Sequence, residues 1–559
     1  MDLIPSAFVA RPLKIVVIGA GISGIQFAHD ATTSLSGIDL EIYDKNPSLG
    51  GTWYENRYPG CTCDVPSHTY QFNWAPNPSW SSLYPPAPEI HKYLEDVADR
   101  HNLRRFMNFN TKCILAQWNE DSSKWKVVLC DVVSGKEKTI FADVFVYAIG
   151  RLNNYKFPKI AGQNIFRGLQ VHTANWPADM TVKDRQVIVI GNGASAIQCV
   201  AALQPDSNEQ KKALQACPMR YYDFCISLEQ RLAASFMGLW KGTKSQANFT
   251  SLARSFMKSK ITNPDLLNAL LPEFEAGCRR FTPGGHYLDA LQKPNAVLIT
   301  ESGGEYECDI LVYATGFEPY QPRFPVTGRG GRSLSEDWDR EGPCESYMAA
   351  MVAEFPNFFV FNPPICPVNG SAIPGIERAS DYMIRILSRL QTDKLRSVSV
   401  TQRAQRAFNQ WVQSRMPHMV WSGPCKSWCK WIPNSPSFTD RLILSGTDKN
   451  DNGKVVVPWP GTVLHYYAAT EIVRWEDFDL VYENPDDKYA SFGNGVTIDG
   501  FVPNHFPWVH PPTDFGKPER NVEPASQVLA PSNVLYRLTN YVLQLLGVWS
   551  YLGEPPVKS

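Results

Sequence analysis

Two short apolar runs along the chain each end in a glycine-rich turn that leads into a helical stretch. The first run, KIVVI at residues 14–18, precedes the turn GAGISG at 19–24 and a helical pattern from Ile25 to about Ser34. The second run, VIVI at 187–190, precedes GNGASA at 191–196 and a helical pattern from Ile197 to Leu203. The order strand, tight turn, helix predicts two Rossmann-like dinucleotide-binding units.

The first turn has the residues that a dinucleotide site needs. Gly19 permits the tight turn, Gly21 lets a pyrophosphate approach the backbone at the positive helix N-terminus, and Gly24 allows close packing of helix on strand. Ser23 lies in the same loop. The next apolar run, LEIY, ends at Asp44, whose carboxylate is placed to accept hydrogen bonds from the two ribose hydroxyls of an adenosine. These residues predict one complete dinucleotide site.

Two longer patterns narrow the chemistry. Residues 50–64 (GGTWYENRYPGCTCD) fit G-G-x-W-x-x-x-x-Y-P-G-x-x-x-D, and residues 166–177 (FRGLQVHTANWP) fit F-x-G-x-x-x-H-x-x-x-W-P. Together with the two glycine turns they resemble type I Baeyer–Villiger monooxygenases of the flavin-containing monooxygenase family, enzymes that use NADPH and O2 to insert an oxygen next to a ketone. The resemblance covers most of residues 14–400, and it implies FAD at the first turn and NADPH at the second.

The resemblance also assigns cofactor contacts to individual residues. It implies that the segment after the first turn wraps the flavin, and that the backbone around Thr62, Cys63 and Asp64 lies near the nicotinamide. Tryptophan and tyrosine suit this task because they offer flat apolar walls. The residues implied to contact FAD are Thr52, Trp53, Asp64, Tyr70 and Cys113, and those implied to contact NADPH are Gly191, Asn192, Gly193, Ala194 and Ser195.

The segment GCRRFTP at 277–283 resembles the family segment that places a catalytic arginine beside the flavin, and the register puts that arginine at Arg280. A permanently charged guanidinium suits the reaction, because the peroxyflavin and the tetrahedral intermediate formed on a ketone are both anionic. The resemblance implies that Asp64 pairs with Arg280 and holds it. From the residues alone, tandem arginines also fit an exposed salt-bridge pair. His172 is interpreted as a hydrogen-bonding hinge residue rather than a general base.

The second unit lacks an expected part. A Rossmann unit needs a second strand after its first helix, and the end of that strand holds the side chains that grip an adenosine 2′-phosphate. Residues 204–235 contain no β-branched run and no Arg-Ser or Arg-Thr pair. Lys211, Lys212 and Arg220 in this segment are candidates to replace that grip, but solvent-exposed helix positions are the favoured explanation for all three. Two interpretations stay open: the gene model has lost an exon, or the protein binds NADPH weakly or not at all. An irregular segment at 432–451 favours the first.

The runs VFVYAIG at 144–150 and LVYATGF at 311–317 resemble the crossovers between the two domains of the family. We therefore expect an α/β fold with two Rossmann-like domains and a C-terminal substrate-lining region. The expected limits are 10–150 and 311–400 for the FAD-binding domain, 151–310 for an inserted and truncated NADPH-type domain, and 401–559 for the C-terminal region. Residues 362–374 are expected to contribute further substrate walls.

Composition and charge indicate which classes of binding partner are excluded, but they do not bear on the reaction. The 559 residues include 54 basic and 55 acidic ones, and the formal charge of -1 gives no field to attract nucleic acid or an anionic membrane. Thirteen cysteines without a zinc-ligand spacing, and a start without a signal peptide, predict reduced thiols, no metal site and a cytoplasmic protein. The uncharged run 538–553 is shorter than a spanning helix, so we expect it to pack on the protein rather than on a membrane.

These observations predict an FAD-dependent monooxygenase that inserts one oxygen atom of O2 next to the ketone of a small-molecule substrate. A biosynthetic pathway such as fungal secondary metabolism is the expected setting. Two alternatives stay open. In the first, the same peroxyflavin hydroxylates carbon or heteroatoms of the substrate. In the second, the protein binds FAD but does not depend on NADPH. No motif encodes the substrate.

Overall fold

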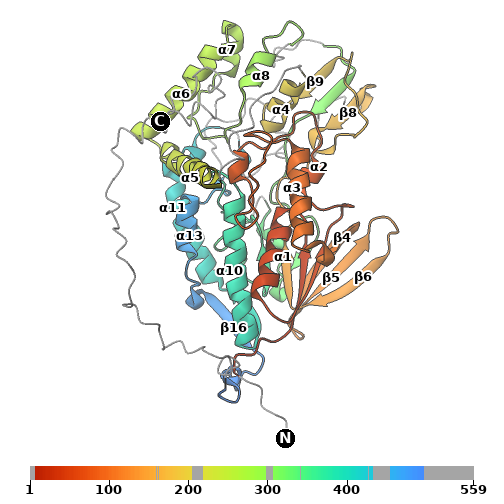
Figure 1. Cartoon of the computed structure of the whole chain (residues 1–559), viewed down its shortest axis with the longest axis vertical. Helices are drawn as coiled ribbons and strands as arrows, with labels where there is room; N and C mark the ends of the chain where they lie inside the picture. The colour runs from red at the N-terminus through yellow and green to blue at the C-terminus, as the bar shows by residue number, and fades with distance from the viewer. Residues whose placement is uncertain are drawn as a thin grey trace.

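A five-stranded parallel sheet forms the centre of the larger domain in the computed structural model (Figure 1). The structure describes residues 7–203, 218–296, 306–431 and 454–496, apart from residues 156, 159, 161, 162, 340, 341 and 426. The strand order is β12-β7-β1-β2-β3. In that order the strands are Phe358–Val360, Val144–Tyr147, Leu13–Ile18, Ile38–Tyr43 and Met107–Asn108. Because β12 follows the inserted domain in the chain, this sheet is assembled from two separate stretches of sequence.

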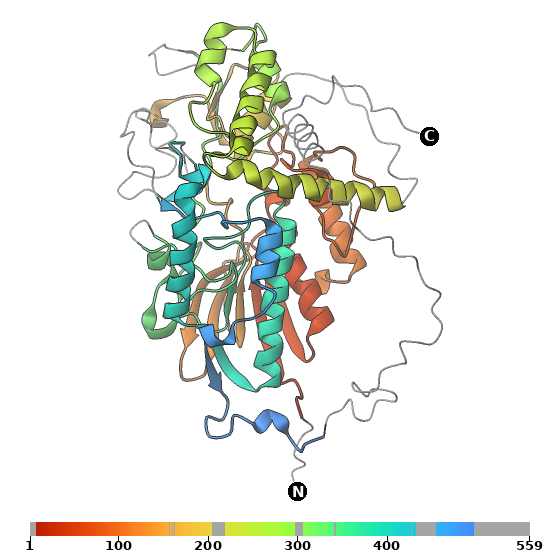
Figure 2. The same ribbon diagram turned by 90° about the vertical axis from the view of Figure 1, so that its left-hand side faces the viewer.

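Strand β1 is apolar along its whole length because both faces of the sheet are covered. Ile15 and Val17 belong to a core shared with helices α1 (Ile22–Ser34) and α10 (Ile373–Thr392). These two helices lie side by side in both ribbon views (Figures 1 and 2). Val16, between them in sequence, points the other way and packs in a second core. The predicted first strand, turn and helix are therefore present, with the helix starting three residues earlier than expected.

A smaller sheet covers the other face. Strands β4 (Thr111–Asn119), β5 (Lys124–Asp131) and β6 (Glu137–Ala142) run antiparallel, and β11 (Val326–Thr327) pairs with β4. Trp125 of β5 is fully buried, and its indole Nε1 donates to the carbonyl of Pro356 over 2.8 Å. This bond ties the smaller sheet to the loop that leads into β12, so the second core depends on both stretches of the chain.

The inserted domain has a three-stranded parallel sheet in the order β8-β10-β9, at Leu169–His172, Ile310–Tyr313 and Val187–Ile190. Its helices are α4 (Ala194–Ala202), α5 (Pro218–Ser235), α6 (Lys244–Lys260), α7 (Pro264–Leu270) and α8 (Gly285–Ala290). In Figure 1, α4, α6, α7 and α8 lie above the larger domain, whereas α5 lies at the height of α3. All four residues of β9 are partly exposed, although all are apolar. Within the described residues, no strand pairs with the other edge of β9.

Part of the segment 204–235, in which the sequence lacks the expected second strand, lies outside the described residues. Residues 204–217, which include Lys211 and Lys212, are not described, nor is the side chain of Arg220. The described chain resumes as α5, which agrees with the helical pattern expected there. The irregular segment at 432–451 and the uncharged run at 538–553 also lie outside the described residues.

The described part of the C-terminal region packs beside α10. Strands β13 (Leu395–Val400) and β16 (Phe478–Tyr482) pair antiparallel, as do β14 (Lys430–Trp431) and β15 (Lys454–Val455). Helices α11 (Gln402–Arg415) and α13 (Val463–Ala469) lie on one side of α10, and α1 lies on the other (Figures 1 and 2). The remaining helices are α2 (Thr52–Glu55), α3 (Ala87–Arg100) and α9 (Leu334–Asp337).

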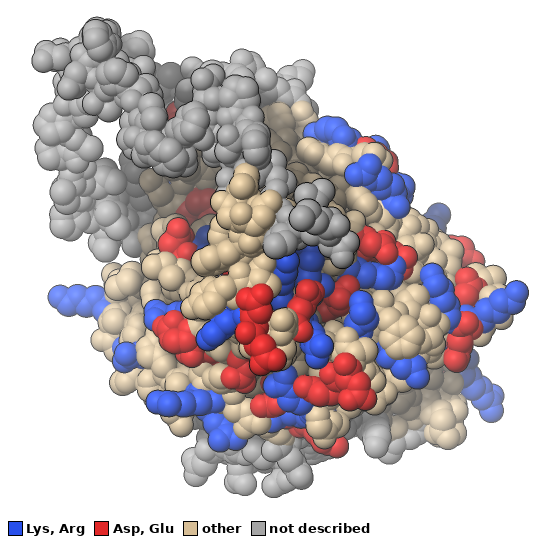
Figure 3. Space-filling view, turned by 90° about the horizontal axis from the view of Figure 1, so that it is seen from below, with Lys and Arg blue, Asp and Glu red and all other residues tan. Residues whose placement is uncertain are grey.

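The surface carries both signs of charge. On the face seen in Figure 3, Lys and Arg side chains are interspersed with Asp and Glu side chains, in keeping with the near-zero net charge. Within the described ranges, no helix combines the length and apolar character needed to cross a membrane.

Candidate functional site

A cavity of about 980 Å³ is lined by residues of the larger domain and of the inserted domain, including both glycine turns. Its lining includes Gly21 of the first turn, Asn192 of the second turn and Arg280 from the stretch after α7. Six residues between positions 362 and 376, together with Ser427 and Trp428, complete it on the C-terminal side. Segments far apart in the chain therefore share one cavity of the size that cofactor sites occupy.

The first turn is shaped for close contact between backbone segments. Gly19 has a φ of +114°, and a Cβ there would lie 2.5 Å from the carbonyl oxygen of Ala148. A Cβ at Gly24 would lie 2.0 Å from the carbonyl oxygen of Gly19, so helix α1 touches the turn as expected. Gly21 faces Gly51, because a Cβ at Gly21 would lie 3.5 Å from the Gly51 Cα. The absence of side chains at these positions leaves a backbone cradle that fits a pyrophosphate.

Asp44 is fixed at the carboxyl end of β2. It is buried, and its two carboxylate oxygens accept hydrogen bonds from the backbone N–H groups of Ala20 (2.8 Å) and Asn46 (2.9 Å). Burial raises the pKa of Asp44, and these two backbone bonds oppose that rise. The carboxylate therefore couples the first turn to the end of β2, beside the cavity.

The segment after the first turn presents aromatic walls. Trp53 of α2 is mostly buried, and its Nε1 donates to the hydroxyl of Tyr70 over 3.2 Å. The two rings meet edge to face, with centroids 5.5 Å apart. Thr52 and Cys113 also line the cavity. Flat aromatic rings held in fixed positions are suited to contact a planar cofactor.

Two hydrogen bonds join the segment after the first turn to helix α4 of the inserted domain. The Tyr58 hydroxyl donates to Gln198 Oε1 of α4 over 2.7 Å, and Gln198 Nε2 donates to the carbonyl of Thr62 over 3.0 Å. Gly60 allows the contact, because a Cβ there would lie 2.4 Å from the carbonyl oxygen of Gln198. Helix α4 therefore packs directly on the loop that contains Thr62 and Cys63, and both of these line the cavity.

The second turn carries a charged neighbour. Gly191 has a φ of +124°, and a Cβ there would lie 2.5 Å from the carbonyl oxygen of Ala314. The side-chain oxygen of Asn192 accepts hydrogen bonds from both terminal nitrogens of Arg279, at 3.2 and 3.3 Å. Ala194 and Ser195 begin helix α4 and line the cavity. A guanidinium thus lies next to backbone N–H groups at a helix N-terminus, where anions are favoured.

Arg280 is held by an acidic partner and two carbonyls. Its Nε and Nη2 donate to the two carboxylate oxygens of Asp64 at 2.6 and 2.9 Å. Nη1 donates to the carbonyl of Val368 at 2.9 Å, and Nη2 also reaches that of Gly370 at 3.4 Å. Burial opposes the charge of Arg280, but the charge and hydrogen bonds of Asp64 keep the pKa of the guanidinium above its ordinary value. About one third of the Arg280 side chain stays exposed, so a fixed cation faces the cavity.

Comparison with known proteins places the chain in a family. Residues 17–85 match the model of an NAD(P)-binding Rossmann-like domain. The chain is 33% identical over 539 residues to the FAD-binding monooxygenase moxY of Dothistroma septosporum, covering 87% of this chain and 83% of that protein. It is 32% identical over 516 residues to a Baeyer-Villiger monooxygenase of Streptomyces coelicolor, covering 85% and 93%. This chain belongs to the FAD-binding Baeyer–Villiger monooxygenases.

The fold agrees with this family. Cyclohexanone monooxygenase from Rhodococcus sp. Phi1 bound to NADP+ superposes with a TM-score of 0.69 at 23% identity, covering 84% of this chain and 100% of that one. The predicted α/β fold class and the prediction of a monooxygenase are confirmed. At this identity the superposition supports the fold alone, so the roles of single residues in this Baeyer–Villiger monooxygenase rest on the geometry above.

Nearly all predicted site residues of this monooxygenase line the one cavity. Only Gly24 and Gly191 are absent from its walls, since each instead makes room for a neighbouring carbonyl. The expected pairing of Asp64 with Arg280 is present. The cavity is lined by Gly19, Gly21, Ser23, Asp44, Thr52, Trp53, Thr62, Cys63, Asp64, Tyr70, Cys113, Asn192, Gly193, Ala194, Ser195 and Arg280.

His172 has the surroundings of a structural residue. It is buried, its Nδ1 accepts the backbone N–H of Ala174 over 3.1 Å, and its Nε2 lies 3.4 Å from the Thr315 hydroxyl. The ring stacks on Tyr155, and burial lowers the pKa of His172 to about 4. A neutral imidazole therefore links the end of β8 to the end of β10, which supports its interpretation as a hinge residue.

Several cavity residues of this monooxygenase carried no signal in the sequence. Arg279 looked like half of an exposed pair, and Gln198 looked like an ordinary helix residue. Trp428 lies over Arg151, whose guanidinium carbon is 5.6 Å from the indole centroid, and both line the cavity. The family fingerprints end before Trp428, so only the fold brings it to the site.

The prediction that all cysteines are reduced thiols is wrong for one pair. Cys278 and Cys425 form a disulfide across 147 residues of sequence. Sequence spacing carries no information about such a pair, because the contact depends on the packing of the C-terminal region against the segment before Arg280. No set of three or more His, Cys, Asp or Glu side chains in the described ranges is arranged to hold a metal ion.

Proposed function

We propose that this monooxygenase binds FAD along the first turn and the segment 50–70, and inserts one oxygen atom of O2 next to the ketone of a small-molecule substrate. The observation that carries the proposal is the ion pair between Asp64 and Arg280. It fixes a positive charge where the flavin-wrapping segment, the inserted domain and residues 368–370 meet. FAD, when bound, supplies the redox chemistry that activates O2. The domain limits 10–150, 151–310, 311–400 and 401–559 belong to the same proposal.

Each residue around the charge has a separate task. Arg280 stabilises the negative charge that develops on oxygen during oxygen insertion, because a preorganised cation costs no reorganisation at the moment of reaction. Asp64 binds the Nε–Nη2 edge of the guanidinium and sets its direction. The carbonyls of Val368 and Gly370 accept hydrogen bonds from Nη1 and Nη2. Val368, Ile376 and Trp428 give the cavity apolar walls nearby, which favours an apolar ketone and excludes water.

We further propose that NADPH binds at the second turn with Arg279 as a phosphate contact. Arg279 forms no ion pair with any described carboxylate, and its hydrogen bonds go to the neutral side chain of Asn192. Burial lowers the pKa of Arg279, as expected of a buried cation without a counter-charge. A phosphate would supply that counter-charge. The NADP+ bound by the related fold of cyclohexanone monooxygenase supports a nucleotide at this turn.

The proposal is tested in two steps on the purified protein. Anaerobic mixing with NADPH should bleach the flavin absorbance, and aerobic turnover of a cyclic ketone should yield the lactone. Arg280→Lys is the matched control for Arg280→Ala, since lysine keeps the charge but loses the two-pronged contact with Asp64. Sulfoxide from a sulfide without lactone from any ketone would replace the proposal with heteroatom oxygenation. A flavin that neither nucleotide bleaches would identify an NADPH-independent protein.

A further inference from the structure

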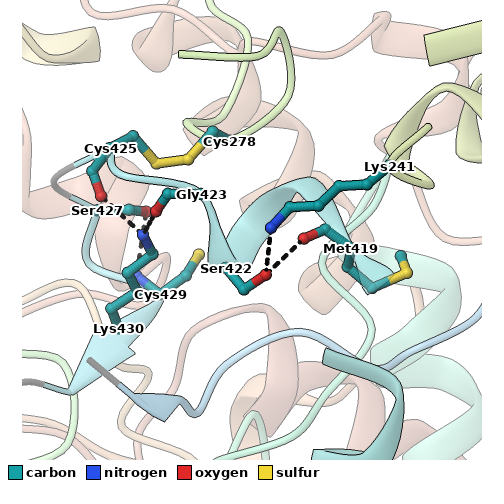
Figure 4. Close-up of a disulfide and its surroundings, with 9 residues drawn as sticks. All are labelled: Lys241, Cys278, Met419, Ser422, Gly423, Cys425, Ser427, Cys429 and Lys430. Carbon is teal, nitrogen blue, oxygen red and sulfur yellow. Dashed lines mark hydrogen bonds between the residues drawn. A yellow bond between two sulfur atoms is a disulfide. The ribbon is translucent and has the colours of Figure 1, made fainter. Parts of the chain in front are cut away.

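A disulfide joins two walls of the cavity. Cys278 and Cys425 are bonded, with Cα atoms 6.1 Å apart (Figure 4). Cys278 immediately precedes Arg279 and Arg280, and Cys425 precedes Ser427 by two residues. All three of these neighbours line the cavity. The bond therefore connects the segment that carries the two arginines to the C-terminal segment that faces them.

Two lysine side chains hold the segment around Cys425 by hydrogen bonds. Lys430 Nζ donates to the carbonyl of Gly423 and, over 2.9 Å, to that of Cys425, and Lys430 is itself buried (Figure 4). Lys241 Nζ donates to the hydroxyl of Ser422 over 2.8 Å. Burial lowers the pKa of Lys430 to about 8, with a further contribution from the charge of Lys241. Two lysines thus fix the backbone on which Cys425 sits.

The Cys278 end is a turn that only glycine permits. Gly277 has a φ of +92°, and a Cβ there would lie 2.6 Å from Leu239 Cδ2. On the opposite side, a Cβ at Gly423 would lie 3.3 Å from the sulfur of Cys278, which is tighter than an ordinary contact. The backbone at Gly423 therefore approaches the sulfur of Cys278 closely, and Gly277 provides the turn that leads into this cysteine.

We propose that Cys278 and Cys425 form a redox-controlled tether that sets the position of Arg279 and Arg280 in the cavity. The effect on turnover rests on the proposed function, in which these arginines act on nucleotide and substrate. In the oxidised form the arginine segment is fixed to the Lys430-supported wall. In the reduced form the two walls move independently, and the arginines lose part of their positioning.

The chemistry of the tether is a two-electron exchange. A dithiol reductant opens it: the S–S bond breaks, two electrons and two protons pass to Cys278 and Cys425, and the reductant becomes a disulfide. Hydrogen peroxide closes it, because the S–S bond forms as the O–O bond breaks and two waters leave. Both cysteines are buried, with 1% and 4% of the residue exposed, so the reductant must reach the sulfurs through an opening of the cavity wall. In reducing compartments the disulfides that do form are commonly transient or redox-sensing.

Peptide mapping tests the bond itself. Trypsin releases residues 261–279, which contain Cys278, and residues 416–426, which contain Cys425. In a non-reduced digest of air-purified protein these two peptides should appear joined, and dithiothreitol should separate them. Two free thiols at these positions after treatment with peroxide would overturn the proposal.

Kinetic measurements test whether the redox state of the bond controls activity. FAD content, flavin reduction by NADPH and product formation are compared in oxidised and dithiothreitol-treated protein, for the wild type, Cys278→Ser, Cys425→Ser and the control Cys130→Ser in β5. We expect reduction to slow turnover on the order of tenfold with FAD content unchanged, because small displacements of positioning groups are costly. Peroxide should restore the wild type and Cys130→Ser, and Cys425→Ser should stay slow in both states.

The outcomes separate the tether from the proposed function. Equal rates of flavin reduction and of turnover in both redox states of the wild type would overturn the tether, even with the bond present. Failure to oxygenate any ketone in either state would count against the proposed function alone, since the rate of flavin reduction by NADPH still reports on the arginine segment. If the serine variants do not fold, the two redox states of the wild type decide the question.

Discussion

Removing the Asp64 charge tests whether the ion pair, rather than the arginine alone, supports oxygenation. Asp64→Asn keeps an oxygen that accepts one hydrogen bond from Arg280 but removes the charge and one of the two contacts at 2.6 and 2.9 Å. A charge-assisted hydrogen bond contributes about 1.5–3 kcal/mol. If that energy is spent on positioning the guanidinium, the rate of product formation should fall by roughly one to two decades.

The magnitude is checked by a double-mutant cycle. Arg280→Ala alone should lower the rate on the order of 10²–10³-fold, because one preorganised donor to developing charge is lost. The double variant Asp64→Asn with Arg280→Ala should be no slower than Arg280→Ala, since Asp64 then has no guanidinium to hold. Stopped-flow absorbance gives the rates, and bound FAD per protein is the control. Additive losses in the double variant would refute the idea that Asp64 acts through Arg280.

Three further predictions follow from other parts of the structure. Boiled protein should release FAD into solution, because no His or Cys occupies a known attachment motif; a colourless folded protein that takes up no FAD would contradict the cofactor assignment. NADPH should be only weakly preferred over NADH in flavin reduction, because no strand-end arginine is described beside β9. Arg279→Ala should weaken the binding of both nucleotides more than Arg279→Lys does. Strong rejection of NADH by the wild type would show that another basic group binds the 2′-phosphate. Glu377→Gln should stabilise the protein at pH 8 but not at pH 4, because burial raises the pKa of Glu377 to about 7. The folded state then binds the proton more tightly than the unfolded chain. The contribution of Glu377 to stability is therefore fully present below its ordinary pKa of 4.5 and is lost as the pH rises through about 7, by up to about 3 kcal/mol. Thermal melting at the two pH values measures it, and an equal shift at both would show that charge is not the cause.

Local patterns predicted the elements, whereas the contacts between distant segments needed the fold. The run at 14–18 and the glycines after it encode strand, turn and helix within about twenty residues, and the structure has all three. Asp64 and Arg280 are 216 residues apart, and their pairing was predictable only through a resemblance. The disulfide between Cys278 and Cys425 had no such guide, and the prediction for it was wrong. Pairing across long separations depends on packing that no local periodicity encodes.

The inserted domain shows a second limit. The run VIVI at 187–190 was predicted as a strand, and its composition is typical of a strand covered on both faces. In the described sheet it is an edge strand with every residue partly exposed. Its type followed from its own sequence, but its burial depends on which other segments pair with it.

The late position of β12 in the chain has a consequence for the order of folding. Strand β7 ends at Tyr147, and its partner β12 begins only at Phe358. At 5–20 residues per second, the ribosome needs roughly 10–40 s to bridge that distance. During this interval the apolar edge of β7 has no neighbour, while Val368 and Ile376 of the cavity wall do not yet exist. Nascent chains of this enzyme should therefore depend on chaperones during this interval and bind the flavin only after Ile376 has been synthesised.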